Sequence, residues 1–130
     1  MNKNIKERDE IIFGTYDKDT YMGGARHFRY MNVDTLKKLI NKGYIELDEC
    51  QNCSPSTREF FDFMQEYPAF TAHGYAIIDT RDDYRVTIEG IECDRLDDVT
   101  SNIEALKDFV RLARFANEFD IDDGFYCWWD

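Results

Sequence analysis

Residues 71–90 read TAHGYAIIDTRDDYRVTIEG, and apolar side chains recur at every second position on both sides of a polar segment. Because successive side chains of a β-strand point to opposite faces of a sheet, this period of two predicts two half-buried strands. Tyr75 falls in the first strand and Val86 in the second. The polar residues 80–83 between them are typical of a turn. We therefore predict an antiparallel hairpin over residues 72–90.

Outside the hairpin, three segments carry apolar residues at helical spacing. Serine commonly caps a helix and proline is favoured at the first helical position, so Ser54 and Pro55 indicate the start of one helix. Ser101 and Glu104 form a capping-box pattern, in which each side chain accepts a hydrogen bond from the other's backbone, at the start of another helix. The predicted helices span residues 33–42, 55–67 and 101–119.

The N-terminal part adds two short apolar runs, at residues 11–13 and 27–31, which we interpret as strands. The chain shows no internal repeat and no linker-like segment, so residues 1–130 are predicted to form a single domain. The order of elements indicates an α+β fold with helices packed on one face of a small antiparallel sheet. The succession of two helices and a hairpin also resembles the winged-helix arrangement, and that resemblance is one of topology alone.

The charge of the chain is unevenly distributed. The 130 residues include 16 Lys and Arg against 27 Asp and Glu, a net charge of −11, and residues 79–130 account for −9 of it. A surface of this sign repels nucleic acid and anionic lipid and attracts a basic partner at a rate that falls with salt. The alternative is that the acidity serves solubility alone.

No run of apolar residues is long enough for a membrane span, and the polar start of the chain does not resemble a signal peptide. We expect a cytoplasmic protein with no membrane partner. Cys50 and Cys53 have the spacing of a zinc-binding pair, yet a structural site needs two further ligands. Reduced thiols are the preferred interpretation for these and for Cys93 and Cys127, and zinc binding by the first pair stays open.

Motifs for catalysis are absent from the sequence. There is no Gly-x-Ser-x-Gly segment, no phosphate-binding glycine loop and no His-Glu-x-x-His segment. The two histidines, His27 and His73, lie in no recognisable catalytic pattern. We therefore expect a non-enzymatic protein without a metal or other cofactor.

Residues 125–129 read FYCWW and contain both tryptophans of the chain. Two interpretations of this cluster remain open. The tail folds back and seals the core beneath the last helix, or some of its rings are exposed as the aromatic anchors of a protein-binding face. Together with the acidic residues, this predicts that a partner contacts Asp79, Asp82, Asp83, Glu89, Glu92, Asp94, Asp120, Asp122, Asp123, Phe125, Tyr126, Trp128 and Trp129.

Clustered carboxylates can imitate the phosphates of nucleic acid, and rigid aromatic side chains can take the positions of stacked bases. A small chain of this charge and organisation resembles phage- or plasmid-encoded inhibitors of nuclease defence systems, anti-CRISPR proteins among them. Four segments are also similar to uncharacterised small proteins of bacterial mobile elements, namely QNCSP (51–55), EF (59–60), HGY (73–75) and DYRVTIEG (83–90).

These resemblances imply a non-catalytic inhibitor that occupies the basic, nucleic-acid-binding surface of a partner such as a Cas nuclease complex, and that does not itself bind DNA. The alternative is a winged-helix-like transcriptional regulator or adaptor of a mobile element. Its nucleic-acid contacts would come from a local basic patch, although the overall negative charge opposes approach to DNA. That patch comprises Arg26, Arg29, Lys37, Lys38 and Lys42.

Overall fold

The computed structural model describes residues 1–51, 53–94, 103–121 and 124–129. Within these ranges the chain forms four α-helices, a short 3-10 helix and five β-strands. Their order is α1 (Ile5–Phe13), η1 (Lys18–Thr20), β1 (Ala25–Met31), α2 (Val33–Asn41), α3 (Thr57–Glu66), β2 (Thr71–Ile77), β3 (Val86–Cys93), α5 (Ile103–Leu112), β4 (Glu118–Ile121) and β5 (Phe125–Trp128).

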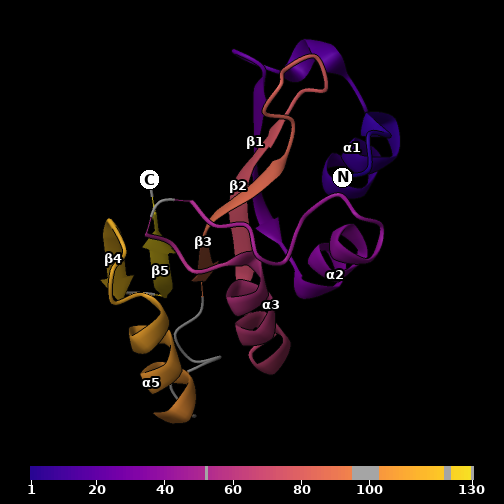
Figure 1. The fold of residues 1–130 in the computed structure, drawn as a ribbon. Coiled ribbons are helices and arrows are strands. Elements are labelled where there is room, and N and C mark those ends of the chain that lie inside the picture. Colours follow the sequence, from indigo (N-terminus) through magenta and orange to yellow (C-terminus); the bar gives the residue numbers. More distant parts are fainter. Residues whose placement is uncertain (52, 95–102, 122–123, 130) are drawn as a thin grey trace.

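The hairpin of β2 and β3 lies in the middle of a five-stranded antiparallel sheet with the order β1-β2-β3-β5-β4. Thr71 pairs with Glu92 and Ala76 with Val86, which confirms the predicted hairpin and extends its second strand to Cys93. Figure 1 shows β1 and β5 on either side of this pair. The α+β class is confirmed, and the hairpin is the centre of the sheet and not a projecting wing.

The core lies between one face of the sheet and three helices. Leu36 and Leu39 of α2, Phe60 of α3 and Phe109 of α5 belong to one buried cluster with apolar side chains of the strands. Each of these four side chains is at most 1% exposed. Burying a side chain of this size stabilises the fold by roughly 1.5–3 kcal/mol. The helices therefore hold one face of the sheet away from water.

The N-terminal segment corrects one prediction. Residues 11–13, interpreted as a strand, form the last turn of α1. The caps explain why the segment is helical: the Asn4 side chain accepts a hydrogen bond from the Glu7 backbone N–H, and Gly14 ends the helix at φ 82°. The run of apolar residues 11–13 is too short to distinguish a strand from a helix by its period. The other short run, at residues 27–31, is confirmed as part of β1.

A buried ion pair attaches α1 to the end of β2. Arg8 and Asp9 are both 0% exposed, and the Arg8 Nε lies 2.9 Å from the Asp9 carboxylate. The guanidinium also donates to the Ile77 carbonyl oxygen and to the Tyr21 hydroxyl, and Tyr21 donates to Asp9. Each buried charge thus has several hydrogen-bond partners, which burial of a charge requires.

The boundaries of two helices differ from prediction. α3 begins at Thr57, because Ser56 caps it in a capping box with Glu59. The predicted cap, Ser54, instead accepts a hydrogen bond from the Gln51 backbone N–H within the preceding turn. The third α-helix expected from the sequence is much shorter than residues 101–119, since α5 ends at Leu112 and β4 begins at Glu118.

α2 matches the predicted range to within one residue. The expected capping residue Ser101 lies outside the described part of the chain. Within the described ranges, no helix is both long and apolar enough to cross a membrane.

Candidate functional site

The face of the sheet opposite the helical layer gathers ionisable and aromatic side chains from all five strands. On β2 and β3 the core-facing positions, such as Ala72 and Ile91, alternate with His73 and Glu92, which point the other way. We call this surface the open face. Its members considered below are His27, Arg29, His73, Tyr75, Glu89, Glu92, Asp94, Glu118, Asp120, Tyr126 and Trp128.

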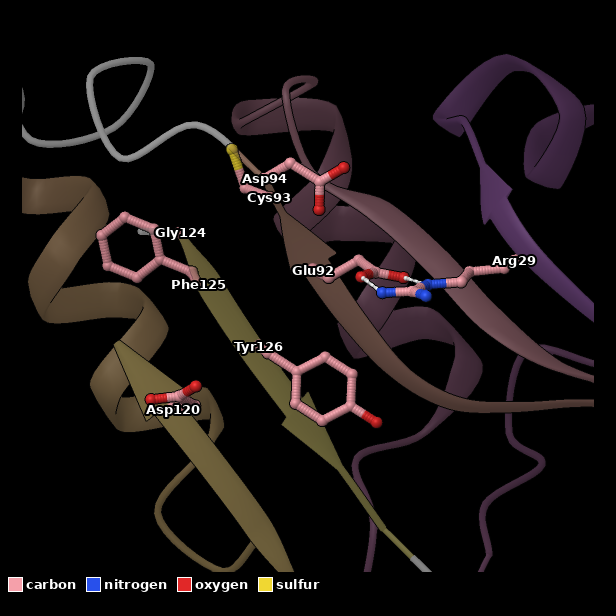
Figure 2. Close-up of a pocket in the computed structure, with 8 residues that line it drawn as sticks. All are labelled: Arg29, Glu92, Cys93, Asp94, Asp120, Gly124, Phe125 and Tyr126. Atoms are coloured by element: carbon pink, nitrogen blue, oxygen red, sulfur yellow. Dashed lines mark hydrogen bonds and ion pairs between the residues drawn. The ribbon is translucent and has the colours of Figure 1, made fainter. Parts of the chain in front are cut away.

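Two adjoining hollows lie on the open face. The first, of about 320 Å³, lies between Glu92, Asp94 and Asp120 (Figure 2). The second, of about 430 Å³, is lined by strand residues that include His73 and Trp128. Arg29 and Tyr126 line both hollows, so the two lie next to each other on the open face.

An arginine–carboxylate pair forms the floor of the first hollow. Arg29 of β1 donates two hydrogen bonds to Glu92 of β3, with Nε–Oε1 and Nη2–Oε2 distances of 2.8 and 2.7 Å (Figure 2). The Glu92 side chain is 3% exposed and that of Arg29 is 58% exposed. The hydrogen bonds from Arg29 to Glu92, with the attraction of that carboxylate, raise the pKa of Arg29. The buried carboxylate therefore remains compensated by a cation that reaches it from solvent.

An irregularity in β1 positions Arg29. Phe28 pairs with Gly74 and Met31 with Ala72, so the pairing register shifts by a residue between them. Phe28 and Met31 are both buried although their spacing is odd, and Tyr30 has a positive φ of 62°. A bulge of this kind turns neighbouring side chains toward the same face. The arginine that precedes Tyr30 is thereby free to reach over β2.

His73 of β2 lines the second hollow. Its ring stacks on Tyr126 with centroids 5.1 Å apart and an interplanar angle of 3°. The residue is 8% exposed, and neither ring nitrogen has a hydrogen-bond partner among the described residues. Burial lowers the pKa of His73 despite the Glu92 carboxylate 3.6 Å from Nδ1. The imidazole therefore behaves as a neutral, largely apolar group at pH 7.

Three further carboxylates surround these groups. Glu89 accepts a hydrogen bond of 3.3 Å from the Trp128 indole and lies 3.7 Å from the His27 ring. Asp94 and Asp120 are exposed, and Figure 2 shows them on different sides of the first hollow. Since Arg29 is already paired with Glu92, the exposed charge around the first hollow is negative.

The structure brings together six of the thirteen residues predicted to contact a partner. They are Glu89, Glu92, Asp94, Asp120, Tyr126 and Trp128, and a seventh, Phe125, also lines the first hollow although it is buried. Arg29 and both histidines were missing from that prediction. Arg29 was assigned to a basic patch, and no local pattern in the sequence indicates that the bulge in β1 lets it reach across β2 to Glu92 of β3.

Three predicted acidic residues lie elsewhere. Asp79, Asp82 and Asp83 are exposed in the turn between β2 and β3. β3 is eight residues long, so this turn is about 25 Å from the other end of the strand at about 3.3 Å per residue. Asp83 is also paired with Arg81 and Arg85 at 2.6 and 3.0 Å. The predicted acidic surface is therefore divided between two ends of the sheet.

Two predicted aromatic contacts are part of the core. Phe125 and Trp129 are 2% and 1% exposed, and Trp129 packs edge-on against Phe60. Tyr126 and Trp128, on the opposite side of β5, are partly exposed. Alternate residues of the tail are therefore buried and partly exposed, because a strand points successive side chains to opposite faces. Asp122 and Asp123 lie outside the described residues.

The basic patch of the alternative hypothesis is largely engaged in internal contacts. Arg29 pairs with Glu92, the Arg26 guanidinium lies 3.7 Å from the Phe13 ring centroid, and Lys42 lies 3.5 Å from Glu7. Three of the five cations are therefore held by other groups of the same chain. Lys37 and Lys38 are exposed on α2.

The four cysteines, all within the described residues, form no disulfide with one another. Cys50 and Cys53 are exposed, whereas Cys93 and Cys127 are buried. Within the described ranges, no three or more His, Cys, Asp or Glu side chains are arranged to hold a metal ion. No family model, curated protein or solved structure matches this chain.

Proposed function

We propose that the chain is a non-catalytic binding protein whose open face docks on a basic surface of a partner macromolecule. The observation that carries this proposal is the gathering of Glu89, Asp94 and Asp120 around hollows lined by the partly exposed rings of Tyr126 and Trp128. Acidic side chains steer a positively charged partner, and aromatic rings supply contact area once it has arrived.

The rigidity of the open face supports the same proposal. Glu89, Asp120, Tyr126 and Trp128 belong to paired strands, and the Trp128 indole holds the Glu89 carboxylate. A surface that is already ordered loses little conformational entropy on binding. The open face already holds one guanidinium on a carboxylate, in the hydrogen bonds from Arg29 to Glu92. An arginine of a partner would form the same kind of contact with the exposed carboxylates.

The partner that we propose is a nucleic-acid-binding protein, such as the nuclease complex of a CRISPR-Cas system, in the cytoplasm of a bacterial host. A basic groove that binds phosphates is complementary to carboxylates, so the chain would compete there with nucleic acid. The support is electrostatic: residues 79–130 carry a net charge of −9. The same sign opposes direct binding of DNA by the chain.

The first experiment captures partners on the immobilised full chain from nuclease-treated host lysate. The expected result is retention of a basic protein that an added oligonucleotide or high salt releases. Asp94→Lys with Asp120→Lys should lower its association rate constant about tenfold, since both residues steer the partner. Asp79→Lys with Asp82→Lys changes the net charge equally at the other end of the sheet and should have a much smaller effect.

Three outcomes would contradict the proposal: no basic protein is retained, the two double variants behave alike, or the oligonucleotide does not compete. A mobility-shift assay with free DNA separates the regulator hypothesis from this one. The chain alone should leave the DNA probe unshifted at low salt, whereas a winged-helix-like regulator would retard it.

A further inference from the structure

The two edge strands of the described sheet differ in structure. β1 is interrupted by the bulge between Phe28 and Met31 and carries Tyr30 at positive φ. Bulges are one of the devices that prevent an edge from pairing with another strand. β4, at the other edge, pairs with β5 in unbroken register. Among the described residues, no strand lies on the outer side of β4.

The two faces of β4 differ in chemistry, and all four of its residues are exposed. Phe119 and Ile121 lie on the core side, yet 46% and 38% of their surface is exposed. Glu118 and Asp120 alternate with them on the side of the open face. If another strand paired with this edge, its side chains on the core side would lie beside Phe119 and Ile121. Its alternate side chains, on the side of the open face, would lie beside the two carboxylates of β4.

We propose that the β4 edge binds an extended segment of the partner protein in which apolar and basic residues alternate. Backbone hydrogen bonds to β4 would supply affinity, and the two kinds of side chain would select the segment and its register. The basic side chains would continue onto the open face beside Asp120. This inference rests on the proposed function in one respect only, namely that the partner is positively charged.

Charge argues for a basic partner over a second copy of the chain. Antiparallel pairing of β4 with itself would bring Glu118 and Asp120 of one copy close to those of the other. Like charges facing each other across strands are destabilising, and each copy carries a net charge of −11. A basic segment would meet the same carboxylates with opposite charge.

The test uses an end-capped eight-residue peptide of alternating valine and arginine, labelled with a dye, and the full chain. Fluorescence anisotropy reports its binding. Two further peptides carry N-methyl groups on all valines or on all arginines. Alternate backbone N–H groups of a strand point to opposite edges, so each methylated peptide is blocked along one edge. Both keep the charge and side chains of the parent peptide.

The parent peptide should bind, and the two methylated peptides should differ in affinity by about tenfold or more. Glu118→Lys should weaken the parent peptide at least threefold, whereas the matched reversal Asp79→Lys should not. Hydrogen exchange should show slower exchange of β4 amides when the peptide is present. Circular dichroism of both variants verifies that they are folded.

Absence of binding, or equal affinity of the two methylated peptides, would overturn strand addition at β4. The proposed function is judged separately, by capture of a basic protein and its dependence on Asp94 and Asp120. If the peptide test fails and capture succeeds, strand addition at β4 is refuted and the proposed binding by the open face stands. If capture fails and the peptide binds selectively, the proposed function is refuted and strand addition at β4 stands.

Discussion

Arg29 of β1 reaches across β2 and holds Glu92 of β3 through hydrogen bonds of 2.8 and 2.7 Å. The two residues differ in exposure, since the carboxylate is buried and the guanidinium is half in solvent. The pair therefore links three strands and keeps a buried charge compensated. It also occupies the floor of the hollow that we propose for partner binding.

Replacing Arg29 should cost more stability than replacing Glu92. Arg29→Ala leaves a buried carboxylate without its cation, and we expect a loss of about 1–3 kcal/mol in the free energy of unfolding. Glu92→Gln leaves no buried charge, and the freed guanidinium can be hydrated, so its loss should be smaller. Urea unfolding of both variants at pH 7 measures the difference. An equal or larger loss for Glu92→Gln would contradict this account.

His73 should make the protein less stable in mild acid. Burial lowers the pKa of folded His73 below the unfolded value of 6.5, so the unfolded chain binds a proton first as pH falls. The contribution of neutral His73 to the free energy of unfolding is therefore fully present above about pH 6.5. Below that pH it decreases by up to about 1.4 kcal/mol per pH unit until the pKa of folded His73 is reached.

Urea unfolding between pH 7.5 and pH 5 tests this behaviour. His73→Gln should reduce the slope of stability against pH, because it removes the titrating group that faces Glu92, Arg29 and the Tyr126 ring. His27→Gln is the matched control, since the His27 side chain is 75% exposed. Identical slopes for the native protein and His73→Gln would show that His73 is not the group responsible.

Gly90→Ala should disrupt the contact between β3 and β5. A Cβ at Gly90 would lie 2.0 Å from the Cys127 carbonyl oxygen and 2.7 Å from the His73 Nε2. The carbonyl belongs to the backbone of a paired strand, so the strands must separate. We expect a loss of about 1–3 kcal/mol, as for other overpacked sites. A thermal melt that shows unchanged stability would contradict the close packing of these strands.

The four thiols should react in two groups. Ellman's reagent should label Cys50 and Cys53 in the native protein and all four cysteines after unfolding. Burial raises the pKa of Cys127 to about 12, so its thiolate is scarce at pH 8. Rapid labelling of Cys93 or Cys127 in the native state, or no labelling of Cys50 and Cys53 until a reductant is added, would contradict these assignments.

Local patterns were sufficient for α2, α3 and the central hairpin. The apolar side chains of α2 recur at helical spacing, and Asn32 caps its first turn. In the hairpin, the alternation predicted both strands and the burial of Val86 and Ile88, whereas Tyr75 of β2 lies on the open face and Ala72 and Ala76 are its core-facing residues. Such signals lie within a few residues of the element that they specify, so the sequence displays them directly.

The C-terminal region could not be predicted in the same way. Helical spacing of apolar residues continues past Leu112, yet Phe119 belongs to β4 because that segment pairs with β5, and β5 pairs with β3. Pairing with a strand distant in sequence overrides local propensity. The same contacts determine which rings of the tail are buried.

By itself, the sequence determined the α+β class, the hairpin, the extents of α2 and α3 to within a few residues, and the concentration of negative charge in residues 79–130. Tertiary structure alone decided that Asp79 and Asp94 lie at opposite ends of β3, that Arg29 compensates Glu92, and that β4 forms an edge. The reason is that period and caps act over a few neighbouring residues, whereas strand order and register depend on contacts between distant segments.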